Sequence, residues 1–171
     1  MIGLDRTNGF SPRIGLFWAE LEAVRRGTVR YVQGLCSEQL AWSPQSDVES
    51  IGTLLLHIAA VERSWIGEDI GRRPMGEEWM AAFPIRFGIP QVVGQPLDYY
   101  VNKLDTIRAE TRALLQSLSD EDLSRPITPL DPGDGADTFT VEWILHHLVE
   151  HEAHHRGQIA LLKRWYRAQH A

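Results

Sequence analysis

The sequence predicts an all-α fold: a four-helix bundle with a long connection between its second and third helices. Three observations lead to this prediction. Four segments carry apolar residues at alternating steps of three and four, the spacing of one face of an α-helix. An irregular stretch, residues 66–96, separates the second segment from the third and contains four prolines and five glycines. No alternation of apolar and polar residues is long enough to indicate a sheet.

The first helix is expected to begin at Pro12 with Ser11 as its N-cap, because proline is favoured at the first helical position. It should end before a polar turn over residues 34–44. Its predicted buried face consists of Ile14, Phe17, Leu21, Val24, Thr28, Tyr31 and Leu35.

The second helix is expected after Ser50, a favourable N-cap. His57 lies at the border of its apolar side, which is formed by Ile51, Leu54, Leu55, Ile58, Val61 and Trp65. Residues 66–96 then predict a crossover that wraps the bundle, with one short helical turn around Glu77 to Ala82.

The third helix is expected over Leu97 to Leu118, and residues 124–140 are a loop by composition. Thr140 is the predicted N-cap of a fourth helix that runs to about Tyr166. The third helix has the seam Tyr100, Leu104, Ile107, Thr111, Leu114 and Leu118. We expect residues 1–171 to form a single domain, since the length suits one core.

Histidine is concentrated in the fourth helix, where residues 146–155 hold five of the seven histidines. The predicted seam of this helix is Val141, Ile144, Leu148, His151, His155, Ile159 and Leu162. His151 and His155 are four residues apart, so their rings stack on one face and can bind one metal ion. His57 is the expected third ligand, and three neutral imidazoles with open positions are typical of a catalytic metal site.

Two alternatives compete with this metal site. His151, Glu152 and His155 match the H-E-x-x-H pattern of zinc proteases, but Glu152 falls off the seam and no strand is available to bind a peptide. The two seam histidines can instead form a buried hydrogen-bonded pair, which requires polar partners. His146 and His154 are expected to face solvent or a neighbouring helix.

Several other side chains are candidates for orienting a ligand or contacting a substrate. His147 lies four residues before His151 and can approach the mouth of the site. Arg156 can bind a carboxylate, although an ion pair is the favoured interpretation, and Gln158 can orient a ligand ring by a hydrogen bond. Glu62 and Glu150 are further candidates, but solvated helix faces explain both.

Composition excludes several classes of function. The formal net charge is −6 and no basic block is present, so we expect no nucleic-acid partner. No stretch approaches 18 uninterrupted apolar residues, and no signal peptide is evident, so we expect no membrane span and a cytoplasmic location. Cys36 is the only cysteine and has no histidine nearby, so we expect it to be inert.

Two stretches carry a resemblance to a known family: "SIGTLLLHIAAVERSWIG" at residues 50–67 and "HHLVEHEAHHRGQIALLKR" at residues 146–164. The chain resembles the DinB/YfiT-like superfamily. The resemblance implies a four-helix bundle with a long crossover and a divalent metal ion, usually zinc or nickel. The metal is held by histidines that match His57, His151 and His155. The resemblance also implies a homodimer and, in some relatives, a low-molecular-weight thiol as cosubstrate.

We therefore expect a metal-dependent enzyme that acts on a small molecule by thiol transfer or hydrolysis. Three neutral ligands leave the full charge of the ion available to lower the pKa of a bound water or a bound thiol. The ligand set is therefore compatible with both hydrolysis and thiol transfer. The alternatives are a non-catalytic metal-binding bundle and a protein-interaction module.

Overall fold

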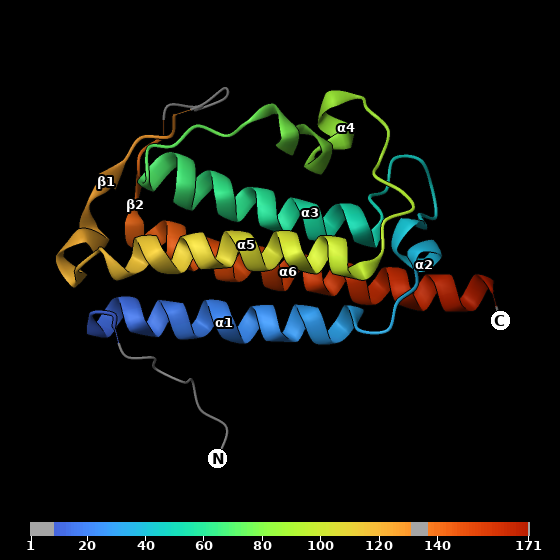
Figure 1. Cartoon of the computed structure of the whole chain (residues 1–171), viewed down its shortest axis with the longest axis horizontal. Helices are drawn as coiled ribbons and strands as arrows, with labels where there is room; N and C mark the ends of the chain where they lie inside the picture. Colours follow the sequence, from blue (N-terminus) through green and yellow to red (C-terminus); the bar gives the residue numbers. More distant parts are fainter. Residues whose placement is uncertain (1–8, 131–136, 171) are drawn as a thin grey trace, which may run out of the picture.

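The computed structural model describes residues 9–130 and 137–170. Its four long helices run along the long axis of the molecule (Figure 1): α1 (Pro12–Val32), α3 (Ile51–Glu62), α5 (Leu97–Gln116) and α6 (Val141–Gln169). Helix α1 packs on α6 and α3 packs on α5, while contacts between α3 and α6 and between α1 and α5 close the bundle. The predicted all-α four-helix bundle is confirmed. No helix in the described part of the chain has the length and hydrophobicity needed to span a bilayer.

Two of the predicted helix caps are confirmed by their hydrogen bonds. The Ser50 hydroxyl at the start of α3 accepts a hydrogen bond from the backbone N–H of Thr53 at 3.2 Å. The Thr140 hydroxyl at the start of α6 accepts one from the backbone N–H of Trp143 at 3.1 Å. These side chains satisfy donors that have no partner within the first helical turn.

The start of α1 is capped in a different way. Ser11 occupies the N-cap position, but its hydroxyl makes no bond to the helix and instead donates to the Asp120 carboxylate at 2.7 Å. Asp120 also accepts hydrogen bonds from the backbone N–H groups of Arg13 and Ile14, at 3.0 and 3.1 Å. The cap therefore comes from the 3-10 helix η3 (Asp120–Ser124), which lies far away in the sequence.

The connection between α3 and α5 begins later than predicted. Helix α3 continues without a break as a π-helix, η1 (Arg63–Ile70), so the prediction of an irregular segment from residue 66 is wrong for its first five residues. The expected short helix is confirmed as η2 (Glu77–Ala82), and α4 (Pro84–Phe87) follows it. The connection passes over α3 on the outside of the bundle (Figure 1).

Five short elements were not predicted: α2, α4, η3, β1 and β2. Helix α2 (Ser37–Ala41) replaces the expected polar turn, because Leu40 is buried in the core and anchors it. Strands β1 (Pro126–Ile127) and β2 (Phe139–Thr140) form an antiparallel pair. Two residues per strand are too few to produce a visible alternation in the sequence.

The core consists of two apolar clusters separated by buried charges. One cluster lies at the end near α2 and the other at the end near β1 and β2. One buried charged residue from each long helix lies between the two clusters: Arg25 on α1, Glu62 on α3, Arg108 on α5 and Glu152 on α6. These residues form the buried charge cluster, with two positive and two negative side chains.

Every charge in this cluster has a partner of opposite sign. Arg25 donates to Glu62 at 2.7 Å and to Glu152 at 2.9 Å. Arg108 donates to Glu62 at 2.8 Å and to Glu152 at 3.3 Å, and the Thr111 hydroxyl donates to Glu62 at 2.7 Å. Burial acts to raise the pKa of Glu62, but the attraction of Arg108 and Arg25 outweighs burial and lowers the pKa to about 2. The interpretation of Glu62 as part of a solvated face is therefore wrong.

Two predicted buried faces need correction. Tyr31 is 47% exposed, and the neighbouring Val32 is buried in its place. On α6, Glu152 is only 2% exposed, whereas His151 and His155 are half-buried at the edge of the inward face. A carboxylate occupies this core position because arginines on two other helices neutralise it, which periodicity alone does not reveal.

Replacing Glu62 by glutamine should destabilise the protein by about 3–5 kcal/mol at pH 7, because it leaves two buried arginines with too little negative charge. Chemical unfolding in urea measures this difference. Glu150→Gln, a substitution in an exposed i,i+4 pair, is the matched control and should cost no more than about 0.5 kcal/mol.

The same comparison has an expected pH dependence. The pKa of Glu62 is lowered from 4.5 to about 2 on folding, so its stabilisation is complete above pH 4.5 and is lost as the pH falls towards 2. The difference in free energy of unfolding between wild type and Glu62→Gln should therefore become smaller as the pH falls from 4.5 to 2. A difference that does not change with pH would contradict the lowered pKa of Glu62.

Candidate metal centre

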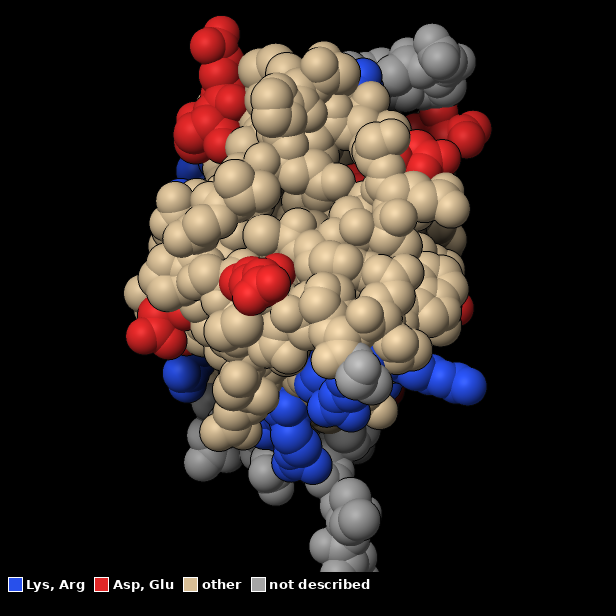
Figure 2. Space-filling model, turned by 90° about the vertical axis from the view of Figure 1, so that its right-hand side faces the viewer, with Lys and Arg blue, Asp and Glu red and all other residues tan. Residues whose placement is uncertain are grey.

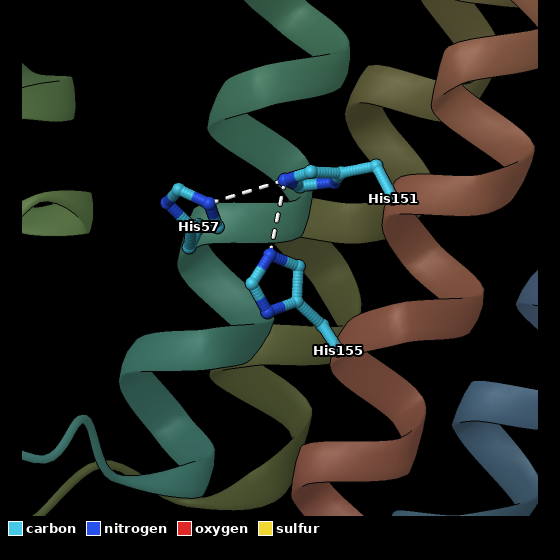
Figure 3. Close-up of side chains that lie close together, drawn as sticks. All are labelled: His57, His151 and His155. Atoms are coloured by element: carbon cyan, nitrogen blue, oxygen red, sulfur yellow. Dashed lines mark hydrogen bonds between the residues drawn. The ribbon is translucent and has the colours of Figure 1, made fainter.

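Three histidines converge between α3 and α6 (Figure 3). Nε2 of His151 lies 3.1 Å from Nε2 of His57 and 3.0 Å from Nε2 of His155. One nitrogen from each ring lies within 4.8 Å of the other two. The structure thus brings together the three residues that the sequence selected as ligands, two from one helix and one from its neighbour.

Helix geometry and the crossover together place these rings. His151 and His155 are one turn apart on α6, and His57 faces them from α3, which packs against α6. The ring of Phe83, at the end of η2, contacts the His57 ring edge-on, with centroids 5.1 Å apart. The crossover therefore covers the cluster beside His57, and the half-buried rings remain partly accessible.

Gln158 controls the orientation of one ring. Its side-chain oxygen lies 2.6 Å from Nδ1 of His155 and accepts a hydrogen bond from it. With the proton on Nδ1, the Nε2 atom of His155 carries a lone pair directed at the other two histidines. The side-chain nitrogen of Gln158 lies 3.3 Å from Nε2 of His154, which flanks the cluster without belonging to it.

The three rings are held in their neutral form. Burial lowers the pKa of His57 to about 4, aided by repulsion from His155 and opposed by the backbone carbonyl of Ala82. Burial and repulsion from the neighbouring histidines lower the pKa of His151 to about 3. Burial also lowers the pKa of His155, although Gln158 acts in the opposite direction. Neutral imidazole is the form that binds a metal ion.

The nitrogen atoms fit a divalent cation better than they fit one another. Nε2 of His151 carries one hydrogen or one lone pair, so it can make only one good hydrogen bond to its two neighbours. In a tetrahedral zinc site with Zn–N distances of about 2.0–2.1 Å, ligand nitrogens are about 3.3 Å apart. The observed 3.0 and 3.1 Å are close to this value. In residues 9–130 and 137–170, no fourth histidine, cysteine or carboxylate joins the group.

His146 and His147, which also lie on α6, do not join the three converging histidines. His147 stacks on Trp143 with centroids 4.9 Å apart, and its ring is 5.7 Å from that of His151. It thus lies beside the centre, in an aromatic stack. His146 is exposed and pairs with Glu150 at 3.4 Å.

Two charged residues next to the ligands point away from them. Glu152 is engaged by Arg25 and Arg108 in the buried charge cluster, so it has no role as the general base of an H-E-x-x-H site. Arg156 lies against Gly27 on α1 rather than over the three histidines. The sequence could not show either placement, because both depend on which helices flank α6.

A pocket of about 340 Å³ lies beside the histidines, and the connection over residues 66–96 contributes Ile85 to its wall. Its lining combines the segment before α3, both helices of the histidine cluster, and α4, and Gln158 belongs to both the pocket and the cluster. The lining residues are Asp47, Val48, Glu49, Leu54, Ile85, Gln158, Leu161, Leu162 and Trp165. No sequence motif marks this pocket, because its walls come from four separate segments.

Comparison with known proteins identifies the family. Residues 20–159 match the sequence profile of the DinB superfamily. The chain belongs to the DinB superfamily. The DinB resemblance of the two histidine-bearing stretches is therefore confirmed.

Relatives in Bacillus subtilis (strain 168) support this membership. The protein YizA is 32% identical over 131 residues, which cover 76% of this chain and 73% of YizA. The protein YkkA is 23% identical over 171 residues and covers 96% of this chain and 95% of its own length. Both carry the description "uncharacterized protein".

Two solved structures share the fold. A DinB-like protein from Bacillus cereus ATCC 10987 superposes with a TM-score of 0.65 at 19% identity, over 86% of this chain and 91% of that chain. A protein from Streptococcus pneumoniae also superposes with a TM-score of 0.65, at 16% identity, over 86% of this chain and 88% of that one. At these identities the likeness concerns the fold alone.

In metal-free protein, His57 and His151 should remain neutral down to about pH 5. Their pKa values of about 4 and 3 are held low first by burial, so the ring signals should not shift between pH 8 and 5. NMR titration of the imidazole protons tests this. A midpoint near the ordinary 6.5 for either ring would contradict the buried, closely packed geometry.

Proposed function

We propose that this DinB protein is a metal-dependent enzyme that acts on a small molecule, by thiol (S-) transfer or by hydrolysis. The ion would be zinc or nickel, held by His57, His151 and His155. The observation that carries the proposal is the convergence of three imidazole nitrogens, one from each ring, within 4.8 Å of one another, with no fourth ligand among the described residues.

Each residue of the centre has a defined task in this proposal. His57, His151 and His155 supply neutral nitrogen donors, and Gln158 fixes the tautomer of His155 by accepting a hydrogen bond from its Nδ1–H. Phe83 shields the His57 ring from solvent on the side of the crossover. When bound, a divalent ion supplies Lewis acidity and lowers the pKa of a water or a thiol.

The number of protein ligands and the adjoining pocket favour an enzyme over a purely structural metal centre. Structural zinc sites are closed by four protein ligands, whereas catalytic sites keep a position open. Only three protein ligands meet here among the described residues, and a pocket adjoins one of them through Gln158. A non-catalytic metal-binding bundle remains the alternative, and it predicts metal binding without turnover of any electrophile.

The proposal includes several further expectations. A low-molecular-weight thiol would serve as cosubstrate in the transfer reaction, and the protein would act in the cytoplasm as a homodimer without nucleic acid. Light scattering of the purified protein measures the oligomeric state. Assay of zinc- and nickel-loaded protein with thiols and activated esters separates the two reactions.

Wild-type protein should bind about one zinc or nickel ion per chain, measured by elemental analysis of tag-free protein. His57→Ala, His151→Ala and His155→Ala should each lose the ion, because two imidazoles leave it with too few ligands. The bundle should stay folded, as circular dichroism can verify, since its core is formed by other residues.

His154→Ala is the matched control for these substitutions. His154 contacts Gln158 and flanks His155, but it is not among the three converging residues, so this variant should keep its metal. Metal loss in His154→Ala together with retention in His155→Ala would move the ligand set by one position. No metal in the wild type, even after incubation with excess zinc and nickel, would refute the proposal.

Removing the hydrogen bond to His155 should weaken zinc binding without abolishing it. Gln158→Ala leaves Nδ1 of His155 without its acceptor, and loss of such a contact typically costs 10–100-fold in metal affinity. Gln158→Glu retains an acceptor and should bind zinc more tightly than Gln158→Ala. Titration against a competing chelator measures both, with Gln116→Ala on the exposed side of α5 as control.

A further inference from the structure

The pocket beside the histidines begins about one helical turn from them. Leu54 precedes His57 by three residues on α3, and Gln158 follows His155 by three residues on α6. One turn of α-helix corresponds to about 5.4 Å along the axis. Leu54 and Gln158 both lie on the α2 side of the histidines, so the pocket lies between the histidines and the end of the bundle near α2.

Large apolar side chains form most of the pocket wall. Ile85, Leu161 and Trp165 are 51%, 42% and 40% exposed, although side chains of this kind are usually buried. Leu54 and Leu162 form the deeper part of the wall and are buried. A volume of about 340 Å³ with apolar walls and a few polar groups is typical of a small-molecule site.

The only charged side chains in the wall are carboxylates. Asp47 and Glu49 lie just before α3, beyond Leu54 as seen from His57, and no lysine or arginine lines the pocket. Among the described residues, neither of the two forms a salt bridge. Glu49 is half-buried, and burial raises its pKa with no cation to offset the effect. An uncompensated carboxylate at an apolar wall is the complement of a ligand cation.

The surface around the pocket has the same character. Figure 2 shows the end of the molecule that carries α2, α4 and the last turns of α6. Uncharged side chains cover most of this face, one acidic patch lies near its middle, and lysines and arginines gather along its lower edge. The face is therefore largely uncharged, with local negative charge near its middle that disfavours anionic ligands there.

We propose that this pocket selects substrates with a hydrocarbon body and a positively charged amine. Leu161, Leu162 and Trp165 would contact the hydrocarbon, and Asp47 and Glu49 would contact the ammonium group. The far end of the substrate would then reach Gln158 and the three histidines. This assignment of substrate class rests on the proposed function, because it uses the pocket as the substrate site of the same metal centre.

Three probes of equal chain length test the charge preference: n-hexylammonium, 1-hexanol and n-hexanoate, titrated by calorimetry into wild-type protein. Hexylammonium should bind about three- to fivefold more tightly than hexanol, the upper part of the range expected for an exposed charge pair, and hexanoate should bind most weakly. Equal affinity for the three probes, or no binding of hexylammonium, would overturn the proposal.

Variants assign the effect to the pocket. Asp47→Asn combined with Glu49→Gln should bring hexylammonium to within about twofold of hexanol while leaving hexanol unchanged. Trp165→Ala should weaken all three probes, and Glu150→Gln, an exposed acidic residue elsewhere on α6, should change none. A preference that survives the double substitution would contradict the roles given to Asp47 and Glu49.

The failure of this proposal can be distinguished from that of the proposed function. His57→Ala removes a ligand from the metal centre but leaves the wall of the pocket intact, so it should keep the preference for hexylammonium. Absence of metal in the wild type with an intact preference would refute only the metal-dependent function. Metal binding without the preference would refute only the substrate class.

Discussion

The arrangement of the bundle depends on the buried charge cluster of Arg25, Glu62, Arg108 and Glu152. Each of the four long helices contributes one member, and each member lies between the two apolar clusters of the core. Buried ions are costly unless they are paired and hydrogen-bonded, so the cluster is stable only when all four helices are in register. The apolar contacts supply the driving force for folding, and the charges restrict the helices to one mutual arrangement.

This constraint also positions the candidate metal centre. Glu152 must face Arg25 and Arg108, and successive residues on a helix are about 100° apart. His151 is therefore turned out of the core towards α3, where it meets His57. A site built on helices that are locked in this way needs little rearrangement to bind an ion. The same constraint separates the chain from H-E-x-x-H proteases, because the glutamate of the pattern neutralises arginines instead of activating water.

The crossover completes the site from outside the four helices. It places Phe83 on the ring of His57 and Ile85 in the wall of the adjoining pocket. The pocket and the histidine cluster share Gln158, so an occupant of the pocket would lie next to the imidazole that Gln158 orients. Helices of the bundle thus carry the three converging histidines and five of the nine residues that line the pocket, and the connections between the helices supply the other four.

The sequence by itself determined the helices and the candidate ligands, because both follow from local rules. Apolar periodicity located α1, α3, α5 and α6, and the caps at Ser50 and Thr140 are local hydrogen bonds. The four-residue spacing of His151 and His155 indicated a shared face. Only the tertiary structure decided which α6 side chain enters the core. Glu152 does so because arginines from two distant helices pair with it, and periodicity contains no information about such partners. The cap of α1 by Asp120, the contact of Phe83 with His57 and the pocket also depend on segments far apart in the chain, so only packing could bring them together.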